Sequence, residues 1–162
     1  VMAAEQAARL ARTSGVRRIH VVPTTTIPQG ISAMMAYDES AEIKDNVEAM
    51  QEAASRVQSG SVTFAARDSD YDGHQIKEGE LLALENGKVA FTGTDLGSVT
   101  AKVAKDLMQE DSQFITLLYG ADVSEEQAAD VEEAVRSLLP EEVELTVAYG
   151  GQPVYYFLIS VE

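Results

Sequence analysis

Cysteine and tryptophan are absent from the chain, and basic residues are few. Without cysteine there can be no disulfide and no thiolate metal site, which is compatible with a reducing compartment. Twelve Lys and Arg residues face 27 Asp and Glu residues, so the formal net charge is −15. A chain this acidic should repel nucleic acid and anionic lipid surfaces, and we expect neither as a partner.

Long apolar runs are also missing. No stretch approaches the roughly 18 residues of a membrane-spanning helix, and no basic-then-apolar leader is visible. We therefore expect no transmembrane segment and a cytoplasmic location. The chain begins on Val1 within a helical pattern, so we expect a piece of a longer protein. Its 162 residues suffice for one domain or two small lobes with a real core.

The acidic residues concentrate toward the C-terminal end. Residues 106–162 hold 13 acidic residues and one basic residue, Arg136, whereas residues 1–40 are close to neutral. A well-solvated helix face explains this pattern, and a docking surface for a basic partner is the alternative.

Helix and strand patterns alternate along the chain and predict an α/β fold with a mixed, partly parallel sheet flanked by helices. Helices are expected over residues 1–13, 31–37, 40–57 with Ser40 as cap, 96–110, and 124–139 with a Ser124/Gln127 capping box. Strands are expected over residues 18–23, 62–67, 113–119, 143–149 and 154–161, with a turn at Ser59-Gly60 and an Asn86-Gly87 hairpin joining 81–84 to 88–91. We expect two lobes, residues 1–94 and 95–162.

The segment at residues 21–30 reads Val-Val-Pro-Thr-Thr-Thr-Ile-Pro-Gln-Gly. Its two prolines predict a stiff, largely extended chain that leaves a strand. Three hydroxyls and one carboxamide suit hydrogen bonding to a ligand head group or a partner backbone, and none can act alone as an acid or base. The candidate binding residues here are Thr24, Thr25, Thr26, Gln29 and Gly30.

Two further turns combine an unusual backbone with polar side chains. The first supplies four candidate binding residues, Arg67, Asp68, Asp72 and His74. The second joins the last two strands and supplies Gly151, Gln152 and Pro153. An ion pair or a turn-capping contact is the structural alternative for the first turn, and a tight strand connection is the alternative for the second.

Residue patterns typical of metal sites and catalysis are incomplete. Three alternating acids precede a glycine as in part of a calcium loop: Asp68, Asp70, Asp72 and Gly73. Such a loop also needs a Glu at its twelfth position, where this chain has Gly79, so a solvated turn is favoured. Neither His20 nor His74 accompanies a nucleophile signature, and no glycine-rich phosphate loop is present. We expect no catalytic and no metal-binding residues.

Six runs of the sequence, taken together, resemble one family. They are residues 4–8, 22–30 (Val-Pro-Thr-Thr-Thr-Ile-Pro-Gln-Gly), 46–50, 62–68, 72–79 (Asp-Gly-His-Gln-Ile-Lys-Glu-Gly) and 150–156 (Gly-Gly-Gln-Pro-Val-Tyr-Tyr). In these runs and their order, the chain resembles the C-terminal domain of the bacterial dihydroxyacetone-kinase-like (DAK family) proteins known as fatty acid kinases. The resemblance covers essentially the whole chain and begins just inside the family domain.

The resemblance implies a fold similar to the two-lobed DegV-like fatty-acid-binding proteins. In the full family protein, an N-terminal kinase domain that binds ATP and magnesium phosphorylates a fatty acid held by a separate DegV-like carrier, giving acyl phosphate for phospholipid synthesis. The C-terminal domain is expected to dock that carrier, alongside the kinase and middle domains of its own chain. The ATP-binding residues are absent here, so this chain is expected to be non-catalytic and without a cofactor.

Two other functions remain open from the sequence. One is a lipid- or small-ligand-binding module in which the polar side chains of residues 24–29 hold a carboxylate. The other is a phosphate-handling catalytic domain that uses Arg67, Asp68 and His74, although no nucleophile or metal set accompanies them.

Overall fold

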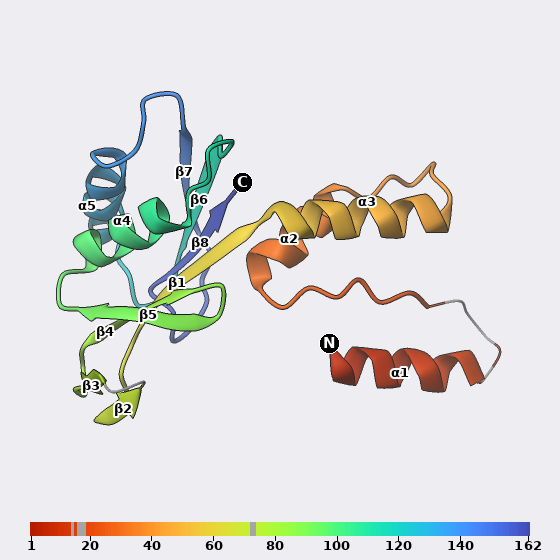
Figure 1. Cartoon of the computed structure of the whole chain (residues 1–162), viewed down its shortest axis with the longest axis horizontal. Helices are drawn as coiled ribbons and strands as arrows, with labels where there is room; N and C mark the ends of the chain where they lie inside the picture. The colour runs from red at the N-terminus through yellow and green to blue at the C-terminus, as the bar shows by residue number, and fades with distance from the viewer. Residues whose placement is uncertain (14, 16–18, 72–73) are drawn as a thin grey trace. The chain divides into compact units, whose positions relative to one another are not determined.

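A computed structural model describes residues 1–13, 15, 19–71 and 74–162 of the chain (Figure 1). By their internal contacts these residues form two compact units, Val1–Val57 (unit 1) and Gln58–Glu162 (unit 2). The lobes expected from the sequence divide the chain elsewhere, after residue 94. None of the described helices is both long enough and apolar enough to cross a membrane.

Unit 1 consists of three helices and an extended segment. The helices are α1 (Met2–Thr13), α2 (Ile27–Met35) and α3 (Ile43–Arg56). The strand expected over residues 18–23 is wrong for its described part, because residues 19–25 contain no strand. A strand needs a neighbouring strand with which its backbone N–H and C=O groups can pair. In this segment the Ile19 carbonyl instead accepts a hydrogen bond from a side chain, Arg12 Nε, at 3.1 Å.

The connection between α2 and α3 is held by Asn46, one of the few buried polar residues. Its Oδ1 accepts from the Asp38 backbone N–H at 2.7 Å, and its Nδ2 donates to the Asp38 carbonyl at 2.7 Å. The expected cap at Ser40 is wrong, because Ser40 donates from its N–H and its hydroxyl to Asp38 Oδ1. Helix α3 instead begins after Glu42, whose side chain makes no cap bond.

Unit 2 contains a six-stranded mixed sheet in the order β5-β4-β1-β8-β6-β7. Its strands are β1 (Gln58–Phe64), β4 (Leu81–Glu85), β5 (Lys88–Gly93), β6 (Phe114–Tyr119), β7 (Glu144–Tyr149) and β8 (Phe157–Val161). Only the β6–β7 pair is parallel, and the other neighbours are antiparallel. A small hairpin of β2 (Ser69–Tyr71) and β3 (His74–Ile76) lies between β1 and β4 in sequence. The predicted α/β class with a mixed sheet is confirmed.

Helices α4 (Leu96–Leu107) and α5 (Glu125–Arg136) lie together on one side of the sheet (Figure 1). The core between them and the strands is built from fully buried side chains such as Val62, Val103, Leu117 and Phe157. The expected turn at Ser59-Gly60 is wrong, because both residues lie within β1.

Two local predictions in unit 2 are confirmed. Asn86 and Gly87 have φ values of 49° and 81° and close the β4–β5 hairpin. Ser124 and Gln127 form a complete capping box at the start of α5. Helix α5 ends at Arg136, three residues before the expected end.

Candidate functional site

The threonine-rich segment forms the start of helix α2. Thr26 is its N-cap, with an extended backbone and a side chain that accepts from the Gln29 N–H at 3.3 Å. Gln29 reaches back, and its Oε1 accepts from the Thr25 N–H at 3.0 Å and from the Thr25 hydroxyl at 3.1 Å. Pro28 fits the first turn because the N–H that proline lacks would have no intrahelical partner there. The helix therefore begins four residues earlier than expected.

Thr25, Thr26 and Gln29 thus form hydrogen bonds with one another at the start of the helix. The spacing Thr-x-x-Gln at residues 26–29 is the sequence signature of such a cap, and it was missed because the two prolines suggested an extended chain. Thr24 lies just outside the cap, and a Cβ added to Gly30 would lie 3.7 Å from its hydroxyl oxygen. Gly30 is therefore not required by packing within the described part of unit 1.

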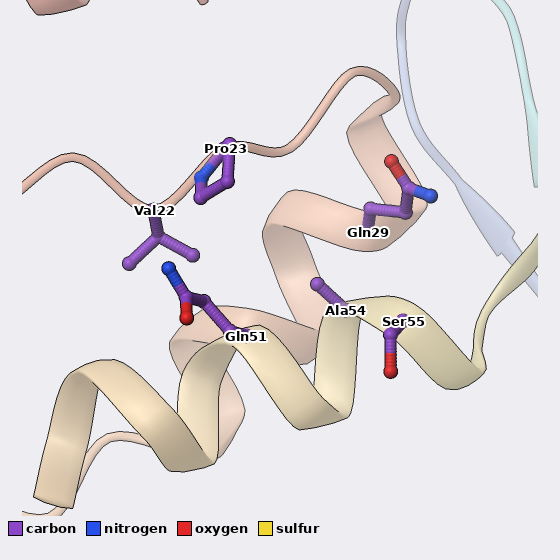
Figure 2. Close-up of a pocket in the computed structure, with 6 residues that line it drawn as sticks. All are labelled: Val22, Pro23, Gln29, Gln51, Ala54 and Ser55. Carbon is purple, nitrogen blue, oxygen red and sulfur yellow. The ribbon is translucent and has the colours of Figure 1, made fainter.

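A hollow of about 330 Å³ lies beside this cap in unit 1. Figure 2 shows Val22 and Pro23 on the extended segment, facing helix α3, with the Gln51 side chain directed toward Val22. The full lining is Val22, Pro23, Gln29, Gln51, Ala54 and Ser55. The lining carries amides, a hydroxyl and apolar carbons but no charged group, so it suits a neutral or hydrogen-bonding group.

Helix α2 buries its small residues and exposes its large apolar ones. Pro28, Ser32 and Ala33 are buried on the helix, which packs against α3. Four large apolar side chains at helical spacing are exposed: Ile27 at 56%, Ile31 at 43%, Met34 at 74% and Met35 at 81%. We call these four residues the α2 stripe. The sequence predicts a helix over residues 31–37 but does not indicate that these large side chains lie at the surface.

The α2 stripe lies in a charge-free stretch. No Asp, Glu, Lys or Arg occurs between Ile19 and Tyr37, although the chain as a whole is strongly charged. A helix face with this composition is the opposite of a solvated surface, which places polar residues outward. The α2 stripe is therefore suited to contact with another apolar surface.

The described residues of the second predicted turn, Arg67 and Asp68, are exposed, and Asp68 makes a local structural contact. Asp68 Oδ1 accepts from the Glu78 backbone N–H at 2.7 Å, a turn-capping contact that ties the two ends of the β2–β3 hairpin together. Arg67 is exposed beside it. Asp72 and the His74 side chain fall outside the described part of the structure, so their predicted roles are not placed. Among the described residues, no group of three His, Cys, Asp or Glu residues is arranged to hold a metal ion.

The third predicted turn is a tightly bonded loop. Gln152 Nε2 donates to the Leu118 carbonyl at 2.8 Å, and the Gln152 carbonyl accepts from the Ala121 N–H at 3.0 Å. Gly151 has a φ of 66°, and its N–H donates to the Tyr119 carbonyl at 3.3 Å. Gln152 Oε1 is buried without a hydrogen-bond partner. Pro153 is exposed at the tip.

The second and third turns lie at the same end of the sheet in unit 2. The Thr63 hydroxyl donates to the Val154 carbonyl at 2.7 Å, and the Tyr156 N–H donates to the Val62 carbonyl at 2.8 Å. The end of β1, which continues into Arg67, is thus bonded directly to the loop before β8. The threonine segment belongs to unit 1, and a single site shared by all three turns stays a prediction.

Electrostatic perturbations mark caps and turns. Hydrogen bonds from Ser40 lower the pKa of Asp38, and hydrogen bonds from Ser98 at the start of α4 lower the pKa of Asp95. Burial, and next the negative charge of Asp106, raise the pKa of Glu85. Each of these three shifts has a local structural cause, in a turn, a helix start or a strand.

The architecture is that of the DegV class of α/β proteins. A DegV family protein from Corynebacterium glutamicum matches with a TM-score of 0.64 and 16% identity, over 96% of this chain and 67% of that one. A fatty-acid-binding DegV family protein from Thermus thermophilus matches with a TM-score of 0.52 and 16% identity, over 96% and 65%. At this identity the likeness concerns the fold alone.

Sequence comparison identifies the family. The family model of the FakA-like C-terminal domain of fatty acid kinases matches residues 1–162, and the chain belongs to this family. An uncharacterized protein of Staphylococcus haemolyticus is 39% identical over 161 residues, which are 99% of this chain and 28% of that protein. Protein YloV of Bacillus subtilis is 36% identical over 162 residues, which are 100% and 28%. The chain thus spans little more than a quarter of the curated relatives it matches.

Proposed function

We propose that this chain is the recruiting domain of a fatty acid kinase, which docks a separate DegV-like protein carrying the fatty acid. The kinase reaction itself is assigned to other domains, which bind ATP and magnesium. Family membership supports a fatty-acid-related role. The α2 stripe is the observation that carries the docking proposal, because an uncharged apolar helix face at the surface needs an apolar partner.

The α2 stripe can contribute a large part of the favourable free energy of binding. Covering one large apolar side chain contributes about 1.5–3 kcal/mol, so a few such side chains supply most of a micromolar affinity of about 8 kcal/mol. Association also costs rotational and translational freedom. The two methionines are flexible and polarizable, so they can adapt to the shape of the groove that receives them.

The experiment is a calorimetric titration of the chain with the cognate DegV-family protein loaded with palmitate. We expect saturable binding by the wild type and a loss of about tenfold or more for the double variant Met34→Ser, Met35→Ser. Both side chains are largely exposed, so the variant should unfold at the same urea concentration as the wild type.

Met2→Ser is the matched control, because Met2 is 79% exposed on α1, outside the α2 stripe. We expect it to bind like the wild type. If a folded wild-type chain shows no binding to the loaded carrier, the proposed function is wrong. If the acidic surface of unit 2, with 20 acidic residues against six basic ones, attracts a basic surface of the carrier, added salt should slow association.

One observation favours a second function, a small-ligand-binding module. The hollow lined by Gln29, Gln51 and Ser55 offers amide and hydroxyl donors near the threonine segment. A carboxylate held there would accept these hydrogen bonds without a cation. Native mass spectrometry of the purified chain tests this function, and a mass equal to that of the bare polypeptide after incubation with palmitate would contradict it.

A further inference from the structure

The end of the sheet in unit 2 where β6 and β7 finish carries an unusual concentration of aromatic residues. We call this end, formed by residues 120–124 and 150–156, the loop edge. Of the ten aromatic residues of the chain, six lie on it or beside it: Phe64, Tyr119, Tyr149, Tyr155, Tyr156 and Phe157. Tyr149 is 65% exposed and Tyr155 is 39% exposed, so part of each of these two residues is open to a partner.

The loop edge is held rigidly by bonds between its own segments. The N–H groups of Gly120 and Ala121 donate to the carbonyls of Tyr156 and Gln152, at 2.9 and 3.0 Å. A side chain on Gly120 would collide with the backbone carbonyl oxygens of the facing loop. The backbone that carries Tyr149 and Tyr155 is therefore held in place, and its segments lose little conformational freedom on binding.

Val154 lies at the tip of this loop in a backbone conformation that a β-branched residue rarely adopts. Its φ is 74°, and the Tyr155 N–H donates to the Pro153 carbonyl at 2.8 Å, so residues 153–155 form a γ-turn. The turn leaves Val154 53% exposed next to Tyr155. Apolar contact area thus adjoins the exposed ring.

The charge around the loop edge is entirely negative on the side of β6. Asp122, Glu125 and Glu126 follow the strand, are exposed, and begin helix α5. No Lys or Arg occurs between residues 106 and 135. Arg136, the next basic residue, donates to the carbonyls of Val143 and Leu145, at the other end of β7. The exposed Arg67 lies at the same end of the sheet but follows β1, on the other side of β8 from β6. A partner on the β6 side must therefore supply the positive charge.

A second copy of the chain does not meet this requirement, since its net charge is −15. A basic segment of another protein does, because guanidinium and ammonium groups are attracted both to carboxylates and to the faces of aromatic rings. Arginine is favoured over lysine, since its planar group stacks on a ring while its N–H groups remain free for carboxylates.

We propose that Tyr149 and Tyr155 form an aromatic platform on which arginine side chains of the fatty-acid-carrying protein stack, with Asp122, Glu125 and Glu126 as their counter-charges. This inference rests on the proposed function and names the chemistry of the partner. It adds a polar, charge-selective contact to the uncharged contact of the α2 stripe.

The experiment compares replacements that keep or remove the ring face. Calorimetric titrations with the palmitate-loaded cognate carrier are run for two double variants. The Phe variant carries Tyr149→Phe with Tyr155→Phe, and the Leu variant carries Tyr149→Leu with Tyr155→Leu. We expect the Phe variant to stay within about twofold of the wild type and the Leu variant to lose about tenfold or more. The control is Phe114→Leu, because Phe114 is 51% exposed at the opposite end of β6; we expect it to bind like the wild type.

Because Tyr149 packs on Tyr119 with ring centroids 5.3 Å apart, the single variant Tyr155→Leu serves as a second test that leaves this pair intact. A further double variant, Asp122→Asn with Glu126→Gln, removes two of the counter-charges. It should bind the carrier more weakly at low salt, and its affinity should change less with salt concentration than that of the wild type. Wild-type affinity in the Leu variants, or an equal loss in the Phe variant, overturns the platform while leaving the proposed function standing. Absence of binding by the wild type overturns the proposed function and the platform with it.

Discussion

Gly60 offers a direct test of how helix α4 packs on the sheet. The residue lies in the middle of β1, and a methyl group added to it would lie 2.5 Å from Val103 Cγ1 and 2.9 Å from Leu107 Cδ1, both on α4. It would also lie 3.3 Å from Cβ of Ile159 on the neighbouring strand. Val103 and Ile159 are completely buried, so neither can turn toward solvent.

Substitution Gly60→Ala must therefore push α4 away from the sheet or force side chains off their rotamers. Overpacking of a buried site costs about 1–3 kcal/mol, and contacts this short on two helix residues place the variant near the upper end of that range. For a unit of this size the loss corresponds to a fall in Tm of about 10–15 °C.

Urea and thermal unfolding followed by circular dichroism measure this loss. Ser61→Ala is the control, because the neighbouring side chain points to the other face of β1, away from Val103, and should change stability little. Adding Val103→Ala to Gly60→Ala should recover part of the loss, so that the double variant is more stable than the sum of the single changes predicts. A Gly60→Ala protein that unfolds like the wild type would refute the close packing of α4 on β1.

The remaining predictions concern a helix and a strand. Gly30→Ala should stabilise unit 1 by about 0.5–1 kcal/mol, since Gly30 lies inside α2 and the nearest atom to an added Cβ is 3.7 Å away; a loss of stability in urea unfolding would contradict the geometry of α2. The raised pKa of Glu85 means that the folded state favours the protonated carboxyl. The contribution of this protonated carboxyl to the free energy of unfolding is therefore present at acidic pH and is lost as the pH rises through that pKa. Glu85→Gln should match the wild type at acidic pH and exceed its urea midpoint near neutrality, and the reverse order would count against the burial of this group.

Local signals were sufficient where a few adjacent residues determine a structure. Asn86-Gly87 supplies the two positive φ values of a tight hairpin, and Ser124 with Gln127 satisfies the first N–H groups of a helix. Both features depend on residues within one turn of each other. The parallel pairing of β6 and β7 was also within reach, because a helix connects them.

Predictions failed where the local structure is determined by residues that lie far away in the sequence. The sequence predicts a turn at Gly60, yet the glycine is needed because Val103 and Leu107 of α4, more than 40 residues later, approach β1 closely. The β-branched residues after Ile19 favour a strand, but no described strand pairs with them. Backbone propensity without a partner is too weak to define a strand.

The candidate site shows the same division. The threonine segment was correctly identified as unusual, but Thr25, Thr26 and Gln29 mainly satisfy the start of α2. Helical spacing places Ile27, Ile31 and Met34 on one face of that helix, and such a face ordinarily belongs to the core. Which face a helix buries depends on what packs against it, and here α3 takes the face with Ser32 and Ala33. The large apolar residues are left at the surface. The proposed docking role therefore rests on these side chains and not on the threonine hydroxyls.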